Sequence, residues 1–294
     1  MNMMKFKNWF FIFSLIIIIP GLYYLVTSGL KLGIDFTGGA LIEYKFNQNV
    51  DIGSLKQAVS NEGIEIGSIT SLQNNTFIIK TKPLDQVKIN DLKANLNRKF
   101  GGVEERRVEN IGPTIGKELE QKALLALGLS SLTIIVYIAF SFRKIPKPTS
   151  SWRFGVAAIV ALAHDVLVVM GFFAILGKFL SVEVDILFVT ALLTVVGFSV
   201  HDTIVVFDRI RENLLKNPGK KFTDTANLSI VQTLGRSLNT SLTVIFVLVA
   251  LFLFGGETIK WFVVALLVGI ISGTYSSIFN ATALLVWWEE KLGH

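Results

Sequence analysis

Residues 194–213 read TVVGFSVHDTIVVFDRIREN and place His201 and Asp202 in an apolar run that is long enough to cross a bilayer. An ionisable side chain inside a membrane span costs about 2.5 to 3.5 kcal/mol on insertion scales, so it normally faces a partner, a cavity or a proton path. We therefore expect Asp202 to have a specific partner or task within the membrane.

Apolar residues make up 51% of the 294-residue chain and occur in long continuous blocks. A hydrocarbon core of about 30 Å requires roughly 20 apolar residues in a helix, whereas a membrane β-strand alternates over about 10 residues. Because the blocks are continuous, the sequence predicts a polytopic α-helical membrane protein rather than a barrel. The six predicted spans are residues 9–28, 123–142, 154–176, 186–207, 238–256 and 262–288.

The net charge of +6 reflects topology rather than binding to nucleic acid, because the basic residues lie next to the predicted spans. They are Lys5, Lys7, Arg143, Lys144, Lys147, Arg153, Arg209, Arg211, Lys216, Lys220, Lys221 and Arg236, whereas the short opposite loops contain only Lys178 and Lys260. The positive-inside rule then predicts that both termini are cytoplasmic and that residues 30–121 lie outside. The first apolar run lacks a clear cleavage site, so we expect it to be retained as an anchor.

Residues 30–121 change from continuous apolar runs to short alternating elements. Strands are predicted at 40–47, 65–73, 76–82 and 103–111, and helices at 51–63 and 87–100. The order βαββαβ is that of an α+β ferredoxin-like domain, in which two helices cover one face of an antiparallel sheet. Asp51 and Asp85 are expected to cap the helices, and Gly101 with Gly102 to end the second. The chain has no cysteine, so this domain contains no disulfide.

The chain is thus divided into an N-terminal transmembrane helix (1–29), an extracytoplasmic domain (30–121) and a five-helix transmembrane domain (122–294). A cytoplasmic loop is predicted at 208–236, and its first part, DRIRENLLKN, resembles an amphipathic helix that continues the fourth span. The loop is either a solvated connector or a docking surface for a cytoplasmic partner.

Asp202 and Arg236 are predicted to lie at similar depth on consecutive antiparallel spans. Asp202 precedes Phe207 by five residues, which places it in the cytoplasmic half of its span at roughly 1.5 Å per residue. Arg236 enters the fifth span from the same side, so a side-chain ion pair is feasible. Such a pair is either a static bridge between helices or a proton-dependent switch.

Polar residues on the last two spans are expected to line a hydrated path to this pair. Asn239, Thr240 and Thr243 follow Arg236 at helical spacing, and Ser276 with Asn280 forms a second polar pair. Gly269 and Gly273 form a small-xxx-small contact that lets helices approach, and helix packing alone often recruits such residues.

Asp165 and His201 are further candidates for proton relay or gating. The dipeptides His164–Asp165 and His201–Asp202 also raise the possibility of a metal site, and the two aspartates that of an intramembrane aspartyl protease. Asp165 is predicted near mid-membrane, at a different depth from Asp202, which argues against both alternatives. We expect no metal, no cofactor and no enzymatic nucleophile.

Several motifs together resemble the SecD/SecF family of protein-export membrane proteins, a relative of the resistance-nodulation-division (RND) superfamily. They are GIDFTGG (33–39), GPTIG (112–116), AHD (163–165), VGFSVHDTIVVFDRIREN (196–213), GRSLNTSLT (235–243) and GTYSSIFNA (273–281). GIDFTGG lacks the lysine and serine of a nucleotide-binding loop. GPTIGKEL looks like its counterpart, since it lies where the chain leaves the external domain and GIDFTGG lies where the chain enters it. The external region of about 90 residues favours the smaller, SecF branch.

The resemblance implies a six-helix half of an RND-type twelve-helix unit in the bacterial cytoplasmic (inner) membrane, with SecD as the other half. Implied partners are the SecYEG channel, the SecA motor, exported unfolded polypeptides and, as further candidates, YajC and YidC. The resemblance also implies that the proton motive force drives late-stage translocation, with Asp202 and Arg236 as the essential charges. A proton-coupled RND-type small-molecule exporter and a purely structural partner of SecD remain alternatives.

Overall fold

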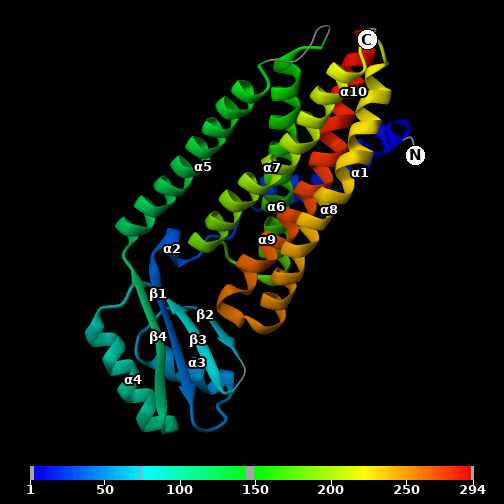
Figure 1. Ribbon diagram of the computed structural model, residues 1–294. Coiled ribbons are helices and arrows are strands. Elements are labelled where there is room, and N and C mark those ends of the chain that lie inside the picture. The colour runs from blue at the N-terminus through cyan, green and yellow to red at the C-terminus, as the bar shows by residue number, and fades with distance from the viewer. Residues whose placement is uncertain (1–2, 73, 144–148, 293–294) are drawn as a thin grey trace. The chain divides into compact units, whose positions relative to one another are not determined.

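The computed structural model describes residues 3–72, 74–143 and 149–292. The chain divides into two compact units, a membrane unit comprising Met1–Lys31 and Leu125–His294, and a small domain comprising Leu32–Leu124 (Figure 1).

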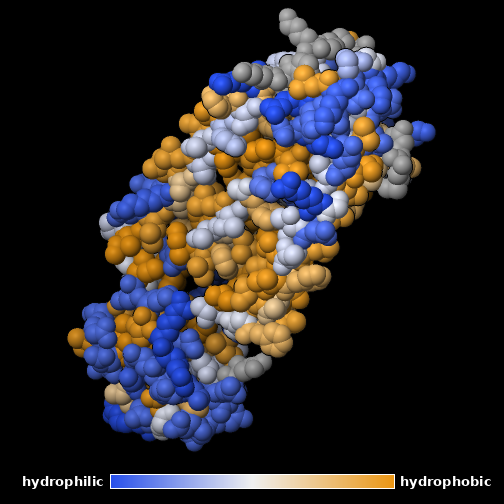
Figure 2. Space-filling model, viewed as in Figure 1, coloured by the Kyte–Doolittle hydropathy of each residue, from blue (hydrophilic) through white to orange (hydrophobic). Residues whose placement is uncertain are grey.

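Six helices among the described residues are long and apolar enough to cross a membrane. They are α1 (Lys7–Thr27, preceded by a 3₁₀ turn at Met3–Phe6), α5 (Pro113–Ser141), α6 (Ser151–Leu180), α7 (Ile186–Lys216), α8 (Phe222–Phe254) and a last span made of α9 (Glu257–Tyr275), a π-helical segment (Ser276–Asn280) and α10 (Ala281–Lys291). Hydrophobic residues gather over these helices in Figure 2. The predicted polytopic α-helical fold is confirmed.

The region predicted as a cytoplasmic loop, 208–236, is almost entirely helical. Helix α7 continues through the amphipathic segment to Lys216, and α8 already begins at Phe222. The connection is therefore only residues 217–221. The sequence prediction placed the end of the span where apolar residues stop, but polar residues extend a helix beyond the bilayer without breaking it.

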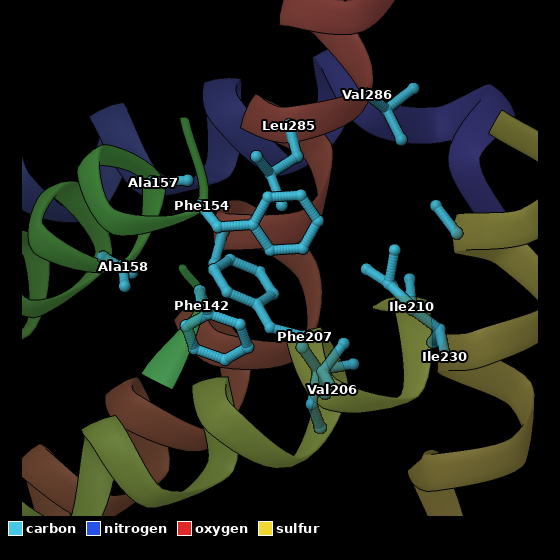
Figure 3. Close-up of a cluster of buried hydrophobic side chains, with 14 of the residues drawn as sticks. Phe142, Phe154, Ala157, Ala158, Val206, Phe207, Ile210, Ile230, Leu285 and Val286 are labelled. Atoms are coloured by element: carbon cyan, nitrogen blue, oxygen red, sulfur yellow. The ribbon is translucent and has the colours of Figure 1, made fainter. Parts of the chain in front are cut away.

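Aromatic side chains fill the core at one end of the helical bundle. Phe142, Phe154 and Phe207 are all at most 2% exposed, and their ring centroids lie 5.0 to 5.8 Å apart. Figure 3 shows the three rings facing one another among aliphatic side chains from several helices. Such contacts add about 0.5 to 1.5 kcal/mol each to the burial of apolar area.

Helices α1 and α6 approach each other through a pair of glycines. A Cβ atom at Gly21 would lie 2.8 Å from the Gly171 Cα, so no other residue fits there without moving the helices. Beyond α1, the backbone N–H of Val184 donates to the carbonyl of Lys31, which joins the segments that follow α1 and α6. The two helices are therefore parallel.

The small domain has the predicted βαββαβ order. Its elements are β1 (Gly39–Phe46), α3 (Ile52–Asn61), β2 (Ile66–Ser71), β3 (Thr76–Thr81), α4 (Gln86–Phe100) and β4 (Val103–Ile111). The antiparallel sheet has the order β2-β3-β1-β4, and helices α3 and α4 contribute to its core (Figure 1). This confirms the predicted ferredoxin-like α+β fold.

The residues predicted to begin and end the two helices of this domain largely do so. The Asp51 carboxylate accepts from the N–H of Ser54 and caps α3, whereas Asp85 occupies the cap position of α4 without a side-chain hydrogen bond. Gly101 ends α4 with a φ of +67°, which a residue with a Cβ atom rarely adopts.

The two glycine motifs of the small domain pack against each other. GIDFTGG forms a single helical turn, α2 (Ile34–Thr37), followed by Gly38 and Gly39. A Cβ at Gly38 would lie 3.0 Å from the Pro113 Cα, and one at Gly116 would lie 2.7 Å from the Phe36 carbonyl oxygen. The glycines therefore allow the backbone that enters the domain to contact the backbone that leaves it.

Candidate functional site: two buried carboxylates in the helical bundle

Asp165 lies at the centre of a hydrogen-bond network that joins three helices of the membrane unit. The residue is 0% exposed. Its Oδ1 contacts His164 Nδ1 and the Ser272 hydroxyl, both at 2.9 Å, and its Oδ2 accepts from Ser199 at 2.5 Å and Ser276 at 2.7 Å. Four donors surround the carboxylate, so its negative charge is well compensated within the chain.

Asp202 is equally buried, at 1% exposure, but has much weaker contacts. The Ser241 hydroxyl lies 3.5 Å from Oδ2, and His201 Nδ1 lies 3.6 Å from Oδ1. These distances exceed those of good hydrogen bonds. The carboxyl group is therefore poorly satisfied in this chain, which distinguishes it from Asp165.

The two aspartates lie closer in depth than the sequence suggested. Ser199 binds Asp165 and precedes Asp202 by three residues of α7, about 4.5 Å along the helix axis. The predicted mismatch in depth was therefore overestimated, because hydropathy sets only an approximate position for each helix in the bilayer.

Two hydrogen-bonded pairs of hydroxyl groups lie next to Asp202 and join the neighbouring helices. Ser241 on α8 and Thr274 on α9 share a hydrogen bond of 2.6 Å. Thr203 donates to Ser277 of the π segment at 2.8 Å, and Ser277 donates to the carbonyl of Ser199 at 2.9 Å. Each pair ends at a backbone carbonyl, because Thr274 also donates to the Ile270 carbonyl, so these hydroxyl groups join α7, α8 and the last span.

Close helix packing allows these contacts to form. A Cβ at Gly273 would lie 3.1 Å from the Ser199 Cβ, and one at Gly269 would lie 2.2 Å from a methyl group of Val195. The predicted small-xxx-small contact thus brings α9 against α7. The π segment that follows presents Ser276 to Asp165 and Asn280 to Ser14 of α1, with an Nδ2 to Oγ distance of 2.6 Å. Single π turns within α-helices are frequent at functional sites.

The predicted ion pair between Asp202 and Arg236 is not formed in this structure. Arg236 is exposed on α8, and the described residues include no carboxylate within ion-pair distance of its guanidinium. Ser237 and Ser241, rather than Arg236, lie on the buried side of α8. The prediction considered only the depth of the two residues, and the rotation of α8 about its axis could not be inferred from it.

The predicted polar path is also only partly assembled. Asn239 and Thr243 are exposed on α8, and the hydroxyls of Thr240 and Thr243 donate to carbonyls of their own helix. Ser276 and Asn280 are buried instead, where they contact Asp165 and Ser14 of α1. Among the described residues, no hydrogen bond joins the two polar faces.

The described residues contain no group of three or more metal-ligating side chains of the His, Cys, Asp and Glu types. His201 is mostly exposed, with 59% of its side chain accessible, whereas His164 is buried and bound to Asp165. The two His–Asp dipeptides therefore differ in environment and do not form one site.

The sequence reasoning missed Ser199, Ser272 and Ser241 as partners of the carboxylates. Ser199 and Ser241 are common residues of transmembrane interfaces, so their presence alone carries little information. A usable signal existed for Ser272 and Ser276, which lie four residues apart and thus on one face of the last span.

Comparison with known proteins assigns the chain to a family. A family model described as "Protein export membrane protein SecD/SecF, C-terminal" matches residues 91–291, and a SecD/SecF GG motif matches residues 23–50. The chain belongs to the SecD/SecF family. Among its relatives, the protein translocase subunit SecF of Thermobaculum terrenum is 49% identical over 99% of this chain and 94% of that protein. The SecF subunit of Anaerolinea thermophila is 43% identical with the same coverage.

Solved SecD/SecF structures show the same fold. A crystal structure of SecDF from Thermus, described as a translocon-associated membrane protein, has a TM-score of 0.85 and 34% identity, and covers 99% of this chain. SecDF in a super-membrane-facing form gives a TM-score of 0.72 and 32% identity. The chain spans 39% of each SecDF chain. The chain is therefore a multi-pass, SecF-type subunit of the protein translocation system with an RND-type fold.

Proposed function

We propose that this chain pairs with a SecD subunit and uses the proton motive force to promote late translocation and release of exported polypeptides. Asp202 is the proton-carrying group in this proposal, and no cofactor is required beyond the proton gradient. The pair acts as a translocation factor beside the SecYEG channel and the SecA motor, with YajC and YidC as further partners, and catalyses no covalent step. Both termini are cytoplasmic.

The contrast between the two buried carboxylates carries the proposal. Asp165 has four close donors, so hydrogen bonds from this chain compensate its negative charge. Asp202 is as deeply buried, but among the described residues its two polar side-chain contacts are long, at 3.5 and 3.6 Å. A buried carboxylate without partners is costly when ionised, so it binds a proton readily or recruits a positive charge. Asp202 is thus the carboxylate whose charge state can change.

Arg236 supports the pairing with SecD. It lies exposed on α8, together with Asn239 and Thr243, in a helix long and apolar enough to span the membrane. An arginine facing lipid is expensive, so a polar surface of another protein is expected to cover this face. The solved SecDF chains are more than twice as long as this one, which leaves room for such a second half.

The proposed cycle joins these two features. A proton from outside neutralises Asp202, and its release toward the cytoplasm restores the negative charge. Arg236 and Asp202 then approach or separate according to that charge, which shifts α8 against α7. One charge crossing 100 mV provides about 2.3 kcal/mol, so a single proton is a modest drive for the release of a polypeptide.

The test uses vesicles that contain this chain, its SecD partner and the SecYEG channel, with SecA and ATP supplied. Release of an exported polypeptide is measured with and without an imposed proton gradient. The Asp202→Asn variant should copurify with SecD but lose the gradient-dependent part of release. Asp208→Asn is the matched control, because Asp208 lies on the same helix but is exposed and paired with Arg211.

Normal gradient-dependent release by Asp202→Asn would overturn the proposal and favour a structural role beside SecD. Proton flux stimulated by small molecules in the absence of Sec components would favour the exporter alternative instead.

A further inference from the structure

A second polar cluster lies between α1, α6 and the last span, on residues that the proposed cycle does not use. We call Ser14, His164, Tyr275 and Asn280 the α1 cluster. Asn280 Nδ2 donates to the Ser14 hydroxyl at 2.6 Å, and the Tyr275 hydroxyl donates to the Phe10 carbonyl at 2.8 Å. The rings of His164 and Tyr275 lie 6.5 Å apart between centroids.

The packing of α1 against α6 places Ser14 and His164 at the same level. The helices are parallel and touch at Gly21 and Gly171. Ser14 precedes the first glycine by seven residues, and His164 precedes the second by seven. Seven residues are almost two helical turns, so both side chains lie on the faces that carry the glycine contact. Both are buried, at 6% and 8% exposure.

Two buried acceptor atoms of this cluster have no donor among the described residues. They are Nε2 of His164 and Oδ1 of Asn280, each on a residue that is 8% exposed. His164 Nδ1 lies 2.9 Å from the Asp165 carboxylate, so Nδ1 carries the proton of the neutral ring and Nε2 carries a free lone pair. A buried polar atom without a partner is costly, and here two occur in one cluster.

We propose that His164 is a second proton-binding group of this protein. A hydronium ion transfers its proton to the lone pair of Nε2 and is left as neutral water. The imidazolium that forms is compensated by the anionic Asp165, and its new N–H is a donor in the cluster in which Asn280 Oδ1 lacks one. This inference rests on the proposed proton-coupled function, but it assigns proton binding to His164 as well as to Asp202. His164 belongs to the cluster beside α1.

The groups around His164 fit this role. Asp165 on its own helix is the charged neighbour, and Tyr275 is the titratable group contributed by α9. Helix α7 places His201 and Asp202 within the turn that follows Ser199, whose hydroxyl binds Asp165. Of the described residues of α1, Ser14 contributes its hydroxyl and Phe10 its carbonyl to the cluster.

The π segment would transmit protonation of His164 to the rest of the bundle. Ser276 binds Asp165, and Asn280 binds Ser14, so one five-residue segment contacts both the carboxylate beside His164 and helix α1. A turn of the Asn280 amide toward a new N–H donor at His164 would change the contact of this segment with α1.

The experiment is nitrogen NMR of the full chain, labelled on histidine and assembled with its SecD partner in liposomes. The chain has three histidines, and the signal lost in His164→Gln identifies the one of interest. Near pH 8 this histidine should be protonated only on Nδ1. At acidic pH a second N–H should appear on Nε2, and Asp165→Asn should change how much of it forms at a given pH.

A His164 ring that is protonated on Nε2 rather than Nδ1 at pH 8 would overturn the inference. So would a ring that gains no second proton by pH 5 while the exposed His201 does. The NMR result needs no transport, so a titrating His164 together with normal release by Asp202→Asn would refute the proposed role of Asp202 and leave this inference standing.

Discussion

The Ser199 hydroxyl on α7 donates a 2.5 Å hydrogen bond to the Asp165 carboxylate on α6. This bond connects the well-satisfied carboxylate to the helix that carries the poorly satisfied one, one turn before Asp202. The position of Asp202 therefore depends on the network around Asp165. A change at either residue is expected to reach the other through α7.

Replacing Ser199 with alanine should destabilise the membrane unit by about 1 to 3 kcal/mol, because one buried oxygen of Asp165 loses a donor. Thermal unfolding of the purified chain in detergent measures the effect. Ser130→Ala is the matched control, since Ser130 donates only to the Leu127 carbonyl of its own helix. Equal melting temperatures for the two variants would contradict the structural importance of the bond.

Asp165→Asn and Asp202→Asn should have opposite consequences. The first introduces an amide among four donors and should lower the melting temperature clearly. The second removes a buried charge that has only long contacts, so it should leave stability unchanged or raise it. The same unfolding assay compares them, and a larger loss for Asp202→Asn would show that we have assigned the two environments wrongly.

The fold was largely predictable because its signals are local. Continuous apolar runs specify spans regardless of their partners, and alternating segments with turn residues specified the βαββαβ domain. The Asn74 and Asn75 turn between two strands has positive φ angles, as asparagine in a tight turn allows.

The site was less predictable because it depends on helix rotation. The predicted similar depth of Arg236 and Asp202 concerns only their positions along the helix axes, whereas a rotation of about 100° per residue decides that Ser237 is buried and Arg236 exposed. The partners of Asp165 come from α6, α7 and the last span, and they meet only when these helices pack. No pattern within one helix contains that information.

Gly21→Ala should force α1 away from α6, because the added methyl group would lie 2.8 Å from the Gly171 backbone. Overpacking of this kind typically costs about 1 to 3 kcal/mol. Gly128→Ala is the control, since nothing lies within 4 Å of a Cβ at that position. Protease sensitivity of the purified chain reports the separation of α1, and unchanged resistance in Gly21→Ala would refute the close contact.

Glu289→Gln should be strongly destabilising. Glu289 is completely buried on α10 and binds Arg153 of α6 at 2.7 Å, while the arginine side chain is 15% exposed. Removing one partner of a buried pair costs about 3 to 5 kcal/mol, because it leaves the other charge uncompensated. The exposed pair of Lys122 and Glu118 provides the comparison, and Lys122→Ala should cause no measurable change. Similar melting temperatures for both variants would contradict the prediction.

Tyr44 should remain protonated well above the pH at which tyrosine normally ionises. Burial of the phenol in the small domain raises its pKa first, and the nearby Glu105 raises it further, from an ordinary value of about 10. Because the folded state holds this proton more tightly than the unfolded state does, the contribution of Tyr44 to stability is complete below pH 10. It is lost as the pH rises beyond that value.

The absorbance of the phenolate form measures whether Tyr44 stays protonated above pH 10. The difference between the native chain and Tyr44→Phe should show no ionisation near pH 10, whereas in denaturant all five tyrosines should titrate there. The substitution is mild, because the hydroxyl makes only a 3.5 Å contact with the Ile89 carbonyl. An ordinary titration near pH 10 in the folded chain would mean that Tyr44 is accessible to solvent and that the core of the small domain is more open than its packing indicates.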